Sequence, residues 1–178
     1  MNSLLIHFNQ LQAEEFISAG IGRQADFQLQ KDIRADKIHW IDANAAATTE
    51  FLSWMDSLRE GINRRLFMGL FDYESHFASY PIGAFYKKHV DAFRDKNGQR
   101  QSNRVLSTVL YLNENWLPEN SGELLIYTED DNHVIEKVSP VFGRLVIFLS
   151  EKFPHEVLPA NCERKSIAGW FRIKEGLL

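Results

Sequence analysis

The tripeptide His89-Val90-Asp91 is the most informative stretch of this 178-residue chain. Side chains alternate between the two faces of an extended strand, so His89 and Asp91 are expected to point the same way. A second histidine lies in Phe153-Pro154-His155-Glu156-Val157, a further strand candidate. Two imidazoles and one carboxylate on a metal ion leave about three coordination positions open. The sequence therefore predicts a metal site formed by His89, Asp91 and His155.

Arg164 follows His155 by nine residues, in the run Arg164-Lys165-Ser166. Its planar guanidinium matches a carboxylate through two parallel hydrogen bonds. Ser166 shares the Arg164 face of a strand, where its hydroxyl would reach the same carboxylate. An open metal triad beside a fixed cation indicates a non-haem Fe(II) oxygenase that takes an acidic co-substrate. Ordinary alternatives are isolated histidines and a surface arginine on an edge strand, and zinc suits the same triad.

Composition permits one soluble enzyme domain. The chain is 44% hydrophobic, which supports a core, and it contains no run of about eighteen apolar residues that would span a membrane. No secretory leader pattern is visible, and the only cysteine, Cys162, cannot form an internal disulfide. We therefore expect a cytoplasmic protein. A net charge of −4 argues against general nucleic-acid binding.

Charge is unevenly distributed around the predicted ligands. The basic window consists of Lys87, Lys88, Arg94, Lys96, Arg100 and Arg104. An acidic segment without Lys or Arg follows, containing Glu114, Glu119, Glu123, Glu129, Asp130, Asp131 and Glu136. These are either two solvated loop faces or a cationic rim near the metal that attracts an acidic partner.

The first 70 residues predict a mixed segment of helices and strands. Apolar alternation indicates a strand at residues 4–8, and a capping pattern indicates a helix over 9–20. Further strands are expected at 26–30 and 37–41. An apolar stripe predicts the clearest helix, over 48–67.

From residue 72 the pattern changes to short β segments separated by turn signals. The expected strands are 72–79, 85–91, 105–111, 123–128, 133–138, 144–149, 155–157 and 166–173. Such an order predicts a mainly β fold with a helical N-terminal part, a double-stranded β-helix (jelly roll) braced by α-helices. We expect one domain over 1–178, with a preface at 1–70, a barrel core at 71–174 and a mobile loop at 95–103.

The motifs that resemble a known family are Tyr80-Pro81, Tyr86, His89-Val90-Asp91, Tyr111-Leu112-Asn113, Pro154-His155-Glu156-Val157, Arg164 and Trp170. With these motifs the chain resembles the prolyl 4-hydroxylase branch of the Fe(II)/2-oxoglutarate-dependent oxygenases. More narrowly, it is similar to the oxygen-sensing prolyl hydroxylases of animals and their bacterial relatives. Residues 33–42 also resemble the segment that precedes the barrel in that branch.

The resemblance implies a role for each part of the site. His89, Asp91 and His155 would bind Fe(II), and no catalytic group is implied beyond this metal centre. Arg164 would hold the distal carboxylate of 2-oxoglutarate, with Tyr111 as a second donor. Ser166 is a further candidate donor, although the animal sensors carry no hydroxyl there.

The resemblance also implies a substrate pocket formed by Tyr80, Tyr86, Trp170 and Arg104. Tyr86 precedes His89 by three residues, so it reaches the site only if the strand starts or bulges between them. Core packing is the alternative for Trp170 and also for Tyr111. Arg104 is further expected to pair with Asp36, which would tie the mobile loop to the segment before the barrel.

The implied reaction is hydroxylation of a prolyl residue, with O2 as oxidant and 2-oxoglutarate converted to succinate and CO2. Ascorbate would serve as reductant. A carboxylate at position 91 disfavours halogenation, because it fills the position that a halide would need. The implied partner is an acidic protein that presents an exposed proline loop, and elongation factor Tu is such a target in bacterial relatives.

Three alternatives stay open on sequence grounds. The same oxygenase chemistry would also suit a small molecule or free amino acid. A cupin-like iron enzyme would use no 2-oxoglutarate, and a non-catalytic jelly-roll module would need no metal. The sequence does not decide the oligomeric state.

Overall fold

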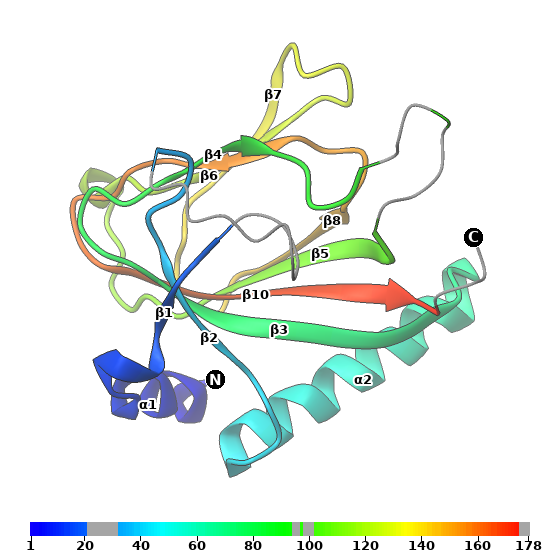
Figure 1. The fold of residues 1–178 in the computed structure, drawn as a ribbon, viewed down its shortest axis with the longest axis horizontal. Helices are drawn as coiled ribbons and strands as arrows, with labels where there is room; N and C mark the ends of the chain where they lie inside the picture. Colours follow the sequence, from blue (N-terminus) through cyan, green and yellow to red (C-terminus); the bar gives the residue numbers. More distant parts are fainter. Residues whose placement is uncertain (21–31, 94–96, 98–101, 175–178) are drawn as a thin grey trace.

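The computed structural model describes residues 1–20, 32–93, 97 and 102–174. Two antiparallel sheets form most of this part of the chain (Figure 1). The six-stranded sheet has the order β1 (Ile17–Ser18), β2 (Lys37–Trp40), β3 (Leu70–Tyr80), β10 (Arg164–Ile173), β5 (Arg104–Tyr111) and β8 (Leu145–Leu149). The four-stranded sheet has the order β4 (Tyr86–His89), β9 (His155–Val157), β6 (Leu124–Tyr127) and β7 (Val134–Val138). These sheets confirm the expected mainly β jelly roll.

Two α-helices cover one face of the larger sheet (Figure 1). Helix α2 (Ala46–Leu66) runs beside β3, and α1 (Asn2–Gln10) packs near it. Two short 3-10 helices, Ala13–Glu15 and Pro118–Asn120, complete the helical elements of the described residues. The helices therefore brace the barrel from outside and leave its interior to the strands.

Alternate residues of the central strands bury two separate apolar cores. Phe77, Leu110 and Ile167 face the helices and pack with side chains such as Phe51 of α2. Their neighbours Ala78 and Tyr111 belong to the second core, which lies with residues of the smaller sheet such as Ile126. This period-two pattern explains why β3, β5 and β10 are buried on both faces.

The helix expected over 48–67 and the strand expected over 37–41 are confirmed, as α2 and β2. Each of the eight expected barrel strands likewise corresponds to one of β3 to β10. Preface and core share one sheet, because β2 pairs with β3. We therefore propose that residues 1–70 and 71–174 form a single domain.

The structure corrects the prediction for the first 20 residues. Residues 2–10 form α1 rather than a strand, and the helix expected over 9–20 is replaced by a 3-10 turn and β1. Leu4 and Phe8 are buried while Ile6 is exposed, so the buried face repeats every four residues, as in a helix. The strand expected at 26–30 lies outside the described residues, as does most of the loop expected at 95–103.

Gly169 of β10 lies where the backbone approaches a neighbouring side chain closely. A Cβ at this position would lie 2.2 Å from the Tyr73 hydroxyl and 2.9 Å from the Glu74 carbonyl oxygen. We expect Gly169→Ala to lower the free energy of unfolding by about 1–3 kcal/mol, as overpacking does in well-packed cores. Urea denaturation measures this loss. Gly61→Ala in α2, where a Cβ would meet only the end of the Arg65 side chain, should instead stabilise the protein. Equal effects at both positions would contradict the close approach at Gly169.

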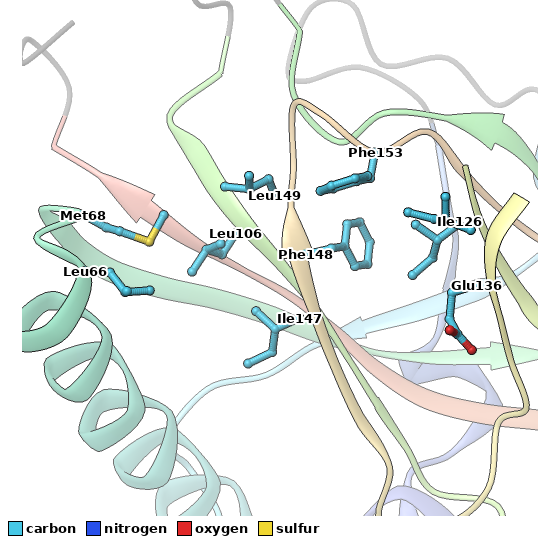
Figure 2. Close-up of a pocket in the computed structure, with 10 residues that line it drawn as sticks. Leu66, Met68, Leu106, Ile126, Glu136, Ile147, Phe148, Leu149 and Phe153 are labelled. Atoms are coloured by element: carbon cyan, nitrogen blue, oxygen red, sulfur yellow. The ribbon is translucent and has the colours of Figure 1, made fainter. Parts of the chain in front are cut away.

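An apolar groove of about 640 Å³ lies beside β8, lined by Leu66, Met68, Leu106, Ile126, Ile135, Glu136, Ile147, Phe148, Leu149 and Phe153 (Figure 2). None of the residues expected in the metal, co-substrate or substrate sites lines it. No described helix is both long and apolar enough to cross a membrane.

Candidate active site

The three expected metal ligands lie together, and strand pairing joins the two histidines. His89 at the end of β4 pairs directly with His155 at the start of β9. The Nε2 atoms of His89 and His155 lie 3.7 and 3.6 Å from the two carboxylate oxygens of Asp91. One ligand atom from each residue falls within 4.8 Å of the other two. The described residues therefore contain a compact group of two imidazoles and one carboxylate.

Asp91 reaches this group in a way that strand alternation did not predict. β4 ends at His89, and Asp91 lies in the bend that follows it. The backbone N–H groups of Asp91 and Ala92 both donate to the Ser150 carbonyl, at 3.1 and 3.2 Å. This pair of hydrogen bonds turns the chain and brings the carboxylate toward the histidines.

The backbone sets the tautomer of both histidines. His89 Nδ1 lies 2.7 Å from the Lys87 carbonyl oxygen, and His155 Nδ1 lies 3.0 Å from that of Phe153. A carbonyl oxygen only accepts, so each Nδ1 must carry the proton. In a neutral imidazole Nε2 then carries the lone pair that a metal ligand requires, and in both histidines this atom faces Asp91.

Two serines hold the Asp91 carboxylate. The Ser107 hydroxyl donates to Asp91 Oδ2 at 2.5 Å and accepts from the Ser150 hydroxyl at 2.9 Å. The Trp170 indole N–H also favours the ionised carboxylate, although it makes no hydrogen bond within ordinary geometric limits. Burial alone would raise the pKa of Asp91, but His155, His89 and Ser107 hold that pKa at about 2.

These environments suit a divalent metal ion. Burial, and after it the neighbouring His155, lowers the pKa of His89 to about 4. At neutral pH the group therefore offers a neutral imidazole beside an ionised Asp91. Nitrogen and oxygen ligands lie about 2.0–2.2 Å from such an ion, so a small contraction of the present spacings would accommodate it. The donor set thus fits a three-ligand centre with open positions.

Arg164 is a buried cation without a buried counter-ion. Its side chain is 1% exposed, and it forms no ion pair with any carboxylate of the described residues. Nη2 lies 3.5 Å from the Tyr111 hydroxyl, while Nε is buried with no hydrogen-bond partner. A buried charge in this state is costly unless an anion joins it. The site therefore fits a bound carboxylate.

The remaining expected co-substrate residue, Ser166, lies on the same strand as Arg164, and Tyr80 lies beside the guanidinium. Ser166 is 2% exposed, shares the Arg164 face of β10 and pairs directly with Tyr111 of β5. Tyr80 of β3 is the cross-strand neighbour of Arg164, and its ring centre lies 4.9 Å from the guanidinium carbon. Tyr80 was expected in the substrate pocket, and it lies at the Arg164 end of the interior.

Trp170 lies six residues beyond Arg164 on β10, and Arg104 stacks on it. The Arg104 guanidinium lies 3.5 Å above the Trp170 ring and binds the Glu74 carboxylate through Nε and Nη2, both at 2.9 Å. The prediction of an ion pair between Asp36 and Arg104 is wrong. Asp36 instead accepts two hydrogen bonds from Arg34, at 2.8 and 2.6 Å, because this arginine lies only two residues away.

Tyr86 reaches the triad because β4 is irregular between Tyr86 and His89. Its ring stacks on the His89 imidazole, with centroids 3.5 Å apart and planes 16° from parallel. The sequence required the strand to start or bulge between these two residues, and β4 starts at Tyr86 and shifts register before His89.

Sequence reasoning missed Ser107 and Ser150. Ser107 lies four residues before Tyr111 on β5, so strand parity already placed it on the interior face. Ser150 carried no comparable signal, because it acts from the turn after β8 through both its carbonyl and its hydroxyl.

Residues 75–172, which contain all of these side chains except Arg34, Asp36 and Glu74, match the family model of the 2OG-Fe(II) oxygenase superfamily. The chain belongs to this superfamily. Its members are defined by Fe(II) and 2-oxoglutarate, so Fe(II), 2-oxoglutarate and O2 are its cofactor, co-substrate and oxidant.

Solved structures agree with this oxygenase assignment. The oxygenase is 44% identical to a prolyl-4-hydroxylase from Pseudomonas putida, with 97% of this chain and 85% of that chain covered and a TM-score of 0.83. It is 30% identical to a Trichoplax adhaerens prolyl hydroxylase in complex with a hypoxia-inducible factor peptide, covering 96% and 76% of the two chains with a TM-score of 0.76.

Curated relatives place the oxygenase near the same branch. Over 159 residues it is 34% identical to a hypoxia-inducible factor prolyl hydroxylase from Caenorhabditis elegans, covering 81% of this chain and 20% of that protein. Over 150 residues it is 33% identical to human Egl nine homolog 1, covering 79% of this chain and 33% of that protein. The chain thus spans a fifth to a third of these relatives, and the resemblance to the prolyl 4-hydroxylase branch is confirmed.

Proposed function

We propose that this oxygenase hydroxylates a prolyl residue in a protein substrate, with conversion of 2-oxoglutarate to succinate and CO2. The observation that carries the proposal is the Arg164 guanidinium. It is buried in the barrel that also holds the triad, and its Nε has no hydrogen-bond partner. A prolyl-4-hydroxylase and a peptide-bound prolyl hydroxylase among the similar structures favour a prolyl residue as the target.

In this proposal His89, Asp91 and His155 hold Fe(II) through two Nε2 atoms and one carboxylate oxygen. When bound, the metal and 2-oxoglutarate supply an oxidant able to hydroxylate an unactivated carbon. The contribution of the chain is binding, orientation and exclusion of side reactions. Ser107 keeps the carboxylate ionised and fixed, and the Lys87 and Phe153 carbonyls hold the Nδ1 side of each imidazole so that Nε2 faces Asp91.

Arg164 would bind the distal carboxylate of 2-oxoglutarate through its fork of donors, assisted by the Tyr111 hydroxyl. Ser166 adds a third donor from the same face. Burial of all three strengthens each hydrogen bond and holds the co-substrate in one orientation. Trp170 and Arg104 would form the wall against which the substrate proline packs, with Tyr80 and Tyr86 on its other sides.

The proposed partner is an acidic protein with an exposed proline loop, and elongation factor Tu is the first candidate. Lys87 and Lys88 are exposed beside His89, whereas the chain as a whole carries a net charge of −4. The other basic-window residues Arg94, Lys96 and Arg100 lie outside the described residues. We further propose a cytoplasmic location, consistent with the single free Cys162, and ascorbate as reductant.

Mass spectrometry of elongation factor Tu after incubation with the enzyme, Fe(II), 2-oxoglutarate and ascorbate tests the proposal. We expect the gain of one oxygen atom on a single prolyl residue, with succinate formed in equal amount. Mixtures without 2-oxoglutarate are the control. Turnover of free proline or another metabolite, with every protein substrate unmodified, would support the small-molecule alternative instead.

Charge reversal at the rim tests the acidic partner. Lys87→Glu should raise the protein-substrate KM by about two- to fivefold at low ionic strength, the size of one exposed charge interaction. The effect should vanish near molar salt, because rim charges act mainly on association and are screened. Arg64 is exposed in the last turn of α2, so Arg64→Glu makes the same charge change on the helical side of the larger sheet and should leave KM unchanged. Equal effects of the two variants would contradict a local cationic rim.

A further inference from the structure

Three side chains form a continuous stack that ends on the triad. The Arg34 guanidinium carbon lies 4.3 Å from the centre of the Tyr86 ring. The other member of the stack is His89, whose imidazole lies nearly parallel to Tyr86 at a centroid distance of 3.5 Å. The aromatic ring therefore lies in contact with both a cation and a triad imidazole.

Arg34 is itself rigidly held. Its Nε and Nη2 donate to the two Asp36 carboxylate oxygens at 2.8 and 2.6 Å, and Nη1 donates to the Gly20 carbonyl at 3.2 Å. Asp36 is 2% exposed, so this fork is shielded from solvent. A guanidinium fixed in this way presents its planar face to the tyrosine without a further loss of side-chain freedom.

The backbone joins the same two segments. Arg34 forms an isolated antiparallel bridge with Tyr86. Ala35 N–H donates to the Phe85 carbonyl at 3.1 Å, and Lys87 N–H donates to the Ile33 carbonyl at 2.8 Å. These contacts lie at the start of β4, where its register shifts between Tyr86 and His89. The segment before the barrel thus supports the strand that carries the first triad histidine.

We propose that Arg34 is a positioning residue that acts through the Tyr86 ring to fix the His89 imidazole for metal binding. Stacking restricts rotation of the imidazole, and the Nδ1 hydrogen bond to Lys87 fixes its remaining freedom. The attraction between cation and ring keeps Tyr86 in the stack. This inference rests on the proposed metal site, and it adds a segment more than 50 residues away in the sequence to that site.

Anaerobic titration with Co(II), followed by its visible absorption and by calorimetry, measures the effect on the metal-free protein. Tyr86→Leu removes the ring and leaves the Arg34–Asp36 pair intact. We expect Co(II) to bind this variant about tenfold more weakly, at the lower end of the loss seen when supporting partners of metal ligands are removed. Tyr86→Phe keeps the ring and should bind within about twofold of the wild type, because the stack needs no hydroxyl.

Tyr127→Leu is the matched control. Tyr127 also lies in the four-stranded sheet beneath a cation, Lys88 at 3.8 Å, and it stacks on no triad histidine. Its Co(II) affinity should equal that of the wild type.

The role of Arg34 itself is tested with Arg34→Met combined with Asp36→Asn, which removes both buried charges together and avoids an unpaired carboxylate. This double variant should weaken Co(II) binding, and adding it to Tyr86→Leu should produce no further loss, since coupled residues are non-additive.

Two failures are distinguishable. Loss of the proposed function would appear as wild-type protein that binds no Co(II), or binds it equally well after His155→Ala. The positioning role would be overturned separately, if wild-type binding depends on His155 but Tyr86→Leu and the Arg34/Asp36 variant bind Co(II) as tightly as the wild type. Additive losses from Tyr86→Leu and the double variant would also overturn it, since they would mean that Arg34 does not act through Tyr86.

Discussion

Asp91→Ala and His155→Ala are expected to abolish iron-dependent turnover while the protein stays folded. The triad binds one ion as a unit, so loss of any ligand atom removes the centre. The effect should exceed the roughly 10–100-fold loss typical when a partner of a metal ligand is removed. Measured 2-oxoglutarate turnover with saturating Fe(II) gives the size of the loss, and circular dichroism checks the fold.

Ser107→Ala provides the graded control for the triad. It removes the 2.5 Å hydrogen bond to Asp91 but none of the three ligand atoms. Its turnover should fall between those of the wild type and the triad variants. Substantial activity in Asp91→Ala or His155→Ala would show that the metal is held elsewhere.

Arg164→Ala is expected to raise the 2-oxoglutarate requirement by well over tenfold. Truncating one partner of a buried charge pair costs about 2–5 kcal/mol, and each 1.4 kcal/mol corresponds to a factor of ten. The KM for 2-oxoglutarate, measured at saturating protein substrate, gives the effect directly.

Lys165→Ala is the control for Arg164. It removes a cation from the next position, but its ammonium group binds Asn9 at 2.8 Å and Glu163 at 3.3 Å, both outside the triad. The 2-oxoglutarate requirement of Lys165→Ala should be unchanged. If Arg164→Ala also leaves it unchanged, Arg164 has a structural role and another donor, such as Tyr111, holds the co-substrate.

Local sequence patterns predicted the barrel because its strands are punctuated by turns and bury alternate faces. The two-residue alternation wrongly predicted a strand at residues 4–8. There Ile6 is exposed, and the buried Leu4 and Phe8 lie one helical turn apart. A short apolar stretch satisfies both periods, and only packing against α2 decides between them.

The site was predictable in its residues but less so in its geometry. His89, Asp91 and His155 meet as expected, yet Asp91 is placed by a bend held by Ser150 rather than by strand alternation. Backbone irregularities of this kind depend on tertiary hydrogen bonds, which leave no pattern in the sequence. Asp36 likewise formed the local pair with Arg34, where the resemblance had indicated a distant one with Arg104.

Anaerobic reconstitution with Fe(II) and 2-oxoglutarate tests the central claim most directly, through the weak visible charge-transfer band of the keto acid bound to the metal. The wild type should develop the band, Asp91→Ala should lack it, and Arg164→Ala should require far more 2-oxoglutarate to reach it. A wild type without the band, or an Asp91→Ala variant that keeps it, would contradict a 2-oxoglutarate-binding iron centre at His89, Asp91 and His155.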